Sequence, residues 1–94
     1  MTIYGFTTVD TGGYFSLDNH VRESFTHLFR SLAERDDFAK RRIRKTWIKY
    51  YGDNEVDEDG QTFDEVLNGF SEGVSTHIAL PYSHIQFEAF EQEV

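Results

Sequence analysis

The stretch VSTHIALPYSHIQFEA, residues 74–89, decides the fold of this chain. On both sides of Pro81 the apolar side chains recur at alternate positions, which is the pattern of a β-strand with one buried face. If Ile78 pairs with Ile85, the apolar residues of both segments lie on the same face. The stretch therefore predicts an antiparallel hairpin that turns at Pro81 and places Phe87 in the core.

The N-terminal residues predict one more strand. Residues 3–9 are rich in β-branched and aromatic side chains, and turn-forming residues follow at positions 10–13. Tyr14 and Phe15 could pair back on this strand as a short arm. We expect the N-terminal strand to join the hairpin in one antiparallel sheet.

Three further segments have the apolar spacing of amphipathic helices. In the first, about residues 17–32, apolar side chains follow Val21 at i+4, i+7, i+8 and i+11. The second begins after Asp36 and runs to about residue 51, where Gly52 is a typical helix-ending glycine. The third, residues 62–73, opens with a Thr-x-x-Glu capping box.

Together these elements predict an α+β fold. We expect a small two-layer domain in which three helices pack on an antiparallel sheet formed by the N-terminal strand and the C-terminal hairpin. A chain of 94 residues is the size of one domain, so the domain should cover residues 1–94. Nine Phe, five Tyr and one Trp supply bulky side chains for its core.

The composition also excludes several classes of site. The absence of cysteine removes thiolate-bound zinc and cysteine nucleophiles, and it is typical of a reducing compartment. No segment has the length of a membrane-spanning helix or the pattern of a signal peptide, so we expect a cytoplasmic protein. Nucleophile-elbow, Walker and dinucleotide-binding motifs are also absent from the sequence. We therefore expect neither an enzyme nor a cofactor or metal.

Charge is distributed very unevenly along the chain, which carries a formal net charge of -8. Residues 1–49 contain all nine Lys and Arg and six of the seventeen acidic residues. Residues 50–94 contain the other eleven acidic residues and no basic one. The acidic half should attract basic proteins and repel nucleic acid at long range.

The segment EVDEDGQTFDEV, residues 55–66, resembles a degenerate EF-hand loop. With Gly60 at position 6, acidic residues fall at positions 1, 3 and 5, as calcium coordination requires. Position 12, which needs a bidentate Glu, is Val66, and Glu65 already has a role in the capping box. A solvated acidic turn is therefore favoured, with calcium binding as the alternative.

A basic helix supplies a different kind of surface. Five basic residues lie close together on it, and they form the candidate nucleic-acid-binding set: Arg41, Arg42, Arg44, Lys45 and Lys49. Trp47 and Tyr50 could stack on bases, as in many single-strand binders, but they share the apolar stripe and are favoured as core residues. The carboxylates of the other half could also neutralise these cations.

The leading functional hypothesis is a small acidic protein-binding module. We expect a stand-alone inhibitor or immunity-type protein, monomer or homodimer, that blocks a basic partner such as a nuclease or another nucleic-acid-handling protein. The expected protein interface is acidic: Asp53, Glu55, Asp57, Glu58 and Asp59. Nucleic-acid binding through the basic helix at residues 40–49 is the first alternative, and calcium binding at residues 55–66 is the second.

Overall fold

The computed structural model describes residues 1–12, 21–81 and 83–94, with the backbone alone at residues 11, 12 and 21–23. Within these residues the chain forms four strands and two helices. In chain order they are β1 (Thr2–Gly12), β2 (Val21–Phe29), α1 (Leu32–Tyr50), α2 (Phe63–Gly73), β3 (Ser75–Leu80) and β4 (Ser83–Glu93). The predicted return arm at Tyr14 and Phe15 lies outside the described residues.

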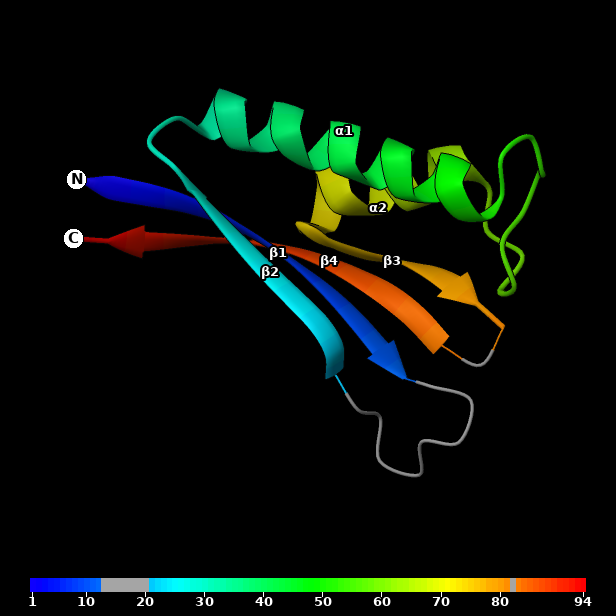
Figure 1. Ribbon diagram of the computed structural model, residues 1–94. Coiled ribbons are helices and arrows are strands. Elements are labelled where there is room, and N and C mark those ends of the chain that lie inside the picture. The colour runs from blue at the N-terminus through cyan, green and yellow to red at the C-terminus, as the bar shows by residue number, and fades with distance from the viewer. Residues whose placement is uncertain (13–20, 82) are drawn as a thin grey trace.

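The strands form one antiparallel sheet in the order β2-β1-β4-β3, and both helices cover the same face of it (Figure 1). The fold is therefore the expected two-layer α+β arrangement. The two chain ends lie side by side at one end of the sheet, where the Met1 amino group donates to the Val94 carbonyl at 3.0 Å. No helix among the described residues is long and apolar enough to cross a bilayer.

The C-terminal hairpin has the predicted register. Ile78 pairs with Ile85, and Phe87 pairs with Thr76. Phe87 is fully buried and its ring stacks on that of Phe6 from β1, with centroids 6.1 Å apart and an interplanar angle of 8°. Two further rings, from the helix layer, meet Phe6 edge-on: Phe38 of α1 and Phe70 of α2. Phe6 therefore lies at the centre of the core.

The first predicted helix is wrong, because residues 21–29 form strand β2. Val21, Phe25 and Phe29 are spaced by four residues, and this spacing fits an alternating strand as well as a helix. Leu28, the residue that favoured a helix, is 62% exposed on the open face of the sheet. On the inner face, His27 and Phe29 pack against Phe38 with centroids 4.5 and 5.3 Å away.

Helix α1 begins earlier than predicted. Ser31 is its N-cap and accepts a hydrogen bond from the Glu34 backbone N–H at 3.3 Å. Asp36 and Asp37 therefore lie within the first turns of one continuous helix. At the other end Gly52 has φ +54°, as expected for a glycine that follows a helix.

Helix α2 has the predicted capping box at its start, formed by Thr62 and Glu65. Its C-cap is Val74, which takes a left-handed conformation at φ 53°. This conformation is uncommon for a β-branched residue. The Val74 carbonyl then accepts from the Ala89 backbone N–H at 2.8 Å, which extends the hairpin contacts by one pair.

Candidate functional site

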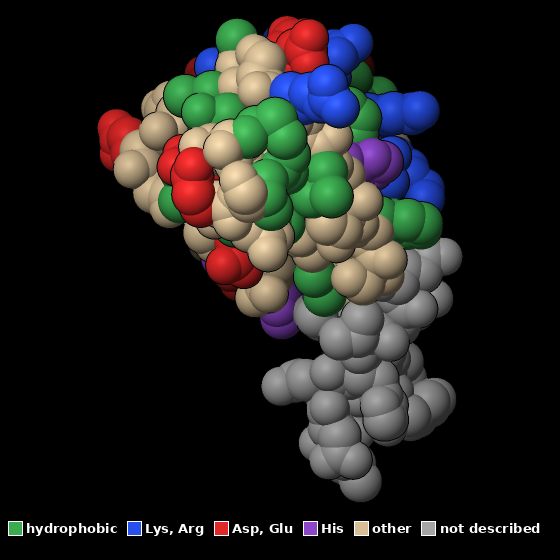
Figure 2. All heavy atoms as spheres, turned by 90° about the vertical axis from the view of Figure 1, so that its left-hand side faces the viewer, with side chains coloured by type: hydrophobic (Ala, Val, Ile, Leu, Met, Phe, Trp, Pro, Cys, Tyr) green, Lys and Arg blue, Asp and Glu red, His purple; other side chains and the backbone are tan. Residues whose placement is uncertain are grey.

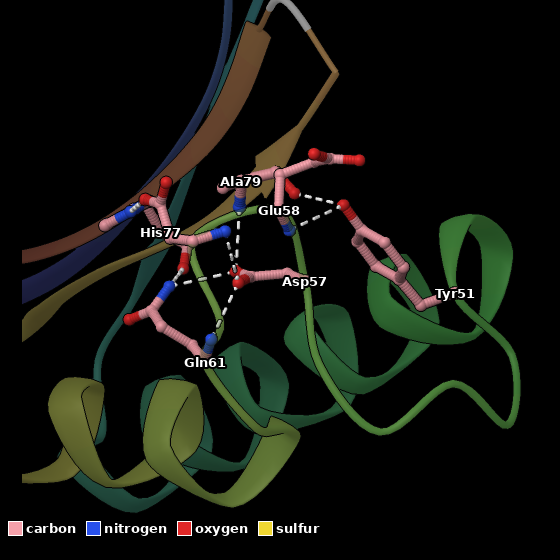
Figure 3. A network of polar contacts seen from close by, with 7 residues as sticks. Tyr51, Asp57, Glu58, Gln61, His77 and Ala79 are labelled. Atoms are coloured by element: carbon pink, nitrogen blue, oxygen red, sulfur yellow. Dashed lines mark hydrogen bonds and ion pairs between the residues drawn. The ribbon is translucent and has the colours of Figure 1, made fainter.

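The predicted acidic interface lies in the loop between α1 and α2. Four of its five carboxylates are exposed: Asp53, Glu55, Glu58 and Asp59. Asp57 is different, because it is only 5% exposed and points back toward the sheet (Figure 3). The structure thus places Asp57 inside the molecule and leaves the other four acidic residues on its surface.

The Asp57 carboxylate joins the loop to the edge of the sheet. Its Oδ2 accepts from the Ala79 backbone N–H at 3.0 Å and from the Gln61 side-chain amide at 2.9 Å. Its Oδ1 accepts from the backbone N–H groups of Asp59 at 3.0 Å and Gln61 at 2.9 Å. The three hydrogen bonds from Asp59 and Gln61 close the turn. The fourth, from Ala79, provides an acceptor for a backbone N–H on the outer edge of β3.

Hydrogen bonding sets the protonation of this carboxylate. Burial by itself would raise the pKa of Asp57, but hydrogen bonds from Ala79, Gln61 and Asp59 stabilise the charged form. Their combined effect keeps the pKa of Asp57 below its ordinary value. The group is therefore ionised at neutral pH, although it is buried.

Two further contacts hold the same loop. The Tyr51 hydroxyl donates to the Ala79 carbonyl and accepts from the Glu58 backbone N–H at 3.3 Å. Burial is the main cause that raises the pKa of Tyr51, and the neighbouring acidic charges add to it. The Asp59 carboxylate contacts His77 Nε2 of β3 at 2.9 Å. The loop is thus held at several points along β3 (Figure 3).

Two carboxylates of the EF-hand-like segment, Asp57 and Glu65, are engaged in hydrogen bonds. Both oxygens of Asp57 already accept hydrogen bonds, and Glu65 Oε1 accepts from the Thr62 backbone N–H at 3.2 Å in the capping box. Within the part of the chain that the structure describes, no group of three or more acidic or histidine side chains is placed to hold a metal ion.

The five basic residues of the predicted nucleic-acid-binding set, all on α1, divide into two groups. Arg41 forms an exposed ion pair with Asp37 at 3.2 Å. The other four, Arg42, Arg44, Lys45 and Lys49, form no ion pair with any carboxylate of the described residues. Within the described chain, the acidic half therefore does not neutralise them. Figure 2 shows Lys and Arg side chains gathered on one side of the molecule, with most acidic side chains of that view on the other.

Three of these cations share one side of the helix. Arg42, Lys45 and Lys49 follow the spacing i, i+3, i+7, which places them on one stripe of α1; we call them the cationic stripe. The stripe borders a cleft of about 180 Å³ between α1 and the sheet. Tyr50, also on the helix, lines the cleft and is 41% exposed.

The sheet forms the floor and one wall of this cleft. Thr8 and Asp10 of β1 and Ile85 of β4 line its floor, and Phe25 of β2, 46% exposed, lines its wall. Thr8 Oγ1 and Asp10 Oδ1 are buried and have no hydrogen-bond partner among the described residues. Arg42 lies over the Phe25 ring, 5.8 Å from its centroid.

The sequence identified only part of this site. Trp47 is a core residue, as favoured, whereas Tyr50 is exposed at the cleft instead of buried. The apolar spacing predicts Phe25 in a helix, and Thr8 and Asp10 belong to no recognisable motif. The available signal was the i, i+3, i+7 spacing of the stripe, which separates these cations from the other basic residues.

Comparisons with family models, with curated proteins and with solved structures found no match.

Proposed function

We propose that this protein binds single-stranded nucleic acid along the cationic stripe of α1. The observation that carries the proposal is a line of three cations, unpaired within the described chain, beside a cleft with buried polar atoms on its floor. Lys and Arg side chains bind phosphates, and nucleic-acid affinity comes largely from such contacts. The stripe supplies the charge that a nucleic-acid backbone requires.

The aromatic residues at the cleft favour a single strand over a duplex. Phe25 of β2 and Tyr50 of α1 both line the cleft and both are partly exposed. Unpaired bases stack on such rings, which supplies affinity that tolerates different sequences. In a duplex the bases are already stacked on each other and cannot use these rings.

The net negative charge does not prevent this function. The acidic loop lies along β3, at one edge of the sheet, whereas the strand residues that line the cleft belong to β2, β1 and β4. Repulsion between separated charges is screened over about 8 Å at physiological salt. The acidic loop therefore lowers the affinity without occupying the site.

Replacing Arg42, Lys45 and Lys49 together by alanine should weaken binding to a fluorescent single-stranded oligonucleotide by at least about tenfold at 50 mM salt. With about 0.7 counterions released per contact, three contacts also predict an affinity that falls about twentyfold between 50 and 200 mM salt. Fluorescence anisotropy measures both effects.

The matched control replaces Lys40, Arg41 and Arg44 by alanine. It removes the same charge from the same helix but leaves the stripe intact. We expect this variant to bind within about threefold of the wild type. Equal losses in the two triple variants would contradict a localised site and leave only a general charge effect.

The acidic loop supports a second candidate function, binding of a basic protein. The observation that favours it is the set of contacts that hold the loop on β3, because a rigid loop loses little entropy when it binds. Asp53, Glu55 and Glu58 are its exposed acidic residues without a described ion-pair partner.

Reversing these three residues to Lys separates the two functions. If the loop binds a basic partner, the reversed variant should lose the inhibition that the wild type exerts on a panel of basic nucleases. Equal inhibition by both proteins would contradict this role. If the stripe is the working surface, the reversal should strengthen oligonucleotide binding at low salt, because repulsion of the phosphates is removed.

A further inference from the structure

The floor of the cleft beside the cationic stripe contains polar atoms that have no role in the proposed binding of phosphate. Thr8 is only 7% exposed, and its hydroxyl has no hydrogen-bond partner among the described residues. Asp10 lies two residues further along the same face of β1. Its Oδ1 is also buried and has no hydrogen-bond partner among the described residues. Buried polar atoms in proteins nearly always have hydrogen-bond partners. These two atoms therefore indicate a ligand that forms hydrogen bonds with them.

The size of the cleft limits what can enter it. The volume of the cleft is about 180 Å³. Sites for drug-sized ligands begin at about 300 Å³. The cleft therefore accepts a single ring system, while the rest of the ligand remains outside beside the stripe.

The chemistry of the floor and the rim identifies the ligand class. Cations at the rim select an anionic group, the rings of Phe25 and Tyr50 select a flat group, and the carboxylate oxygens of Asp10 select hydrogen-bond donors. We propose that the cleft binds the base of a nucleotide, that Asp10 selects guanine, and that the phosphate lies on the cationic stripe. This inference rests on the proposed function and adds base specificity to it.

Guanine is the base whose edge matches these groups. Its N1–H and N2–H₂ groups are adjacent donors, and a carboxylate accepts from both. Its O6, on the other side of N1, can accept from the Thr8 hydroxyl. Adenine and cytosine place a single amino donor beside a ring-nitrogen acceptor, and uracil flanks its N3–H with two carbonyls, which a carboxylate repels.

Competition by mononucleotides tests the inference directly. GMP, IMP, AMP, CMP and UMP are titrated against the complex with a labelled oligonucleotide, and their direct binding to the free protein is followed by NMR. We expect GMP to bind at least about tenfold tighter than AMP, CMP and UMP. IMP, which lacks the 2-amino group, should be severalfold weaker than GMP.

Asp10→Asn is the decisive variant, because it preserves the size of the side chain while it replaces one acceptor by a donor. It should remove the preference for GMP and leave the salt dependence of oligonucleotide binding unchanged. Thr8→Val should reduce GMP binding severalfold. Asp53→Asn, an exposed change of the same kind in the acidic loop, is the matched control and should bind GMP as the wild type does. Circular dichroism confirms that each variant is folded.

The outcomes separate this inference from the proposed function. Oligonucleotide binding without base preference, or a GMP preference that survives Asp10→Asn, would overturn the guanine site and leave the stripe function in place. GMP binding that depends on Asp10, without binding of oligonucleotides, would overturn the strand-binding function and support the cleft. Absence of binding to every probe would overturn both.

Discussion

Replacing Phe87 by alanine should lower the free energy of unfolding by about 3 to 5 kcal/mol. Phe87 is fully buried in the middle of the sheet and stacks on Phe6, so its removal leaves a cavity that neighbouring side chains fill only in part. A domain of this size has a total stability of about 5 to 15 kcal/mol. Chemical denaturation should therefore show a much lower midpoint with an unchanged slope.

Leu28→Ala is the control for this variant. Leu28 is also an apolar residue in a strand, but it is 62% exposed on the open face of the sheet. We expect its replacement to cost less than about 0.5 kcal/mol, as surface substitutions usually do. If both variants unfolded at the wild-type midpoint, the assignment of Phe87 to the core, and with it the hairpin register, would be incorrect.

Asp57→Ala should destabilise the protein by about 2 to 4 kcal/mol at pH 7. The replacement removes four hydrogen bonds and leaves the Ala79 backbone N–H buried without an acceptor. Because folding lowers the pKa of Asp57, its contribution to stability is complete above the unfolded-state pKa of about 3.9. This contribution disappears as the pH falls through the still lower pKa of the folded state.

Thermal melts of the wild type and the Asp57→Ala variant at several pH values test this prediction. The difference between their melting temperatures should be greatest near neutral pH and should shrink below about pH 4. Asp53→Ala, an exposed change in the same loop, should stay within about 0.5 kcal/mol of the wild type. A difference between wild type and Asp57→Ala that is constant with pH would show that the Asp57 charge does not stabilise the fold.

The outer edge of β3 explains why Asp57, alone among the acidic residues of the loop, is buried. β3 is an edge strand, and Asp57 accepts the hydrogen bond from the Ala79 backbone N–H that a neighbouring strand would otherwise accept. In the sequence Asp57 is one of several acidic residues at alternate positions, and nothing distinguishes it from Glu55 or Asp59. Only the tertiary structure, in which Asp57 Oδ2 lies 3.0 Å from the Ala79 backbone N, shows that Asp57 has the structural role.

The hairpin and the start of α2 could be predicted because the interactions that form them are local. The alternation on both sides of Pro81 fixes which residues face inward, and a register that is wrong by one residue would expose Phe87. The capping box of Thr62 and Glu65 is formed by residues three apart in the chain. In such elements the sequence spacing itself determines the geometry.

Strand β2 and the cleft were decided by tertiary structure. A spacing of four residues fits both a helix and a strand, so Phe25 could be placed only once β1 was available as a partner. With that pairing Phe25 lies opposite Thr8 and faces Arg42. The sequence by itself determined the α+β class, the hairpin register and the cations of α1. Their convergence with Thr8 and Asp10 depends on contacts between distant segments, which no local spacing specifies.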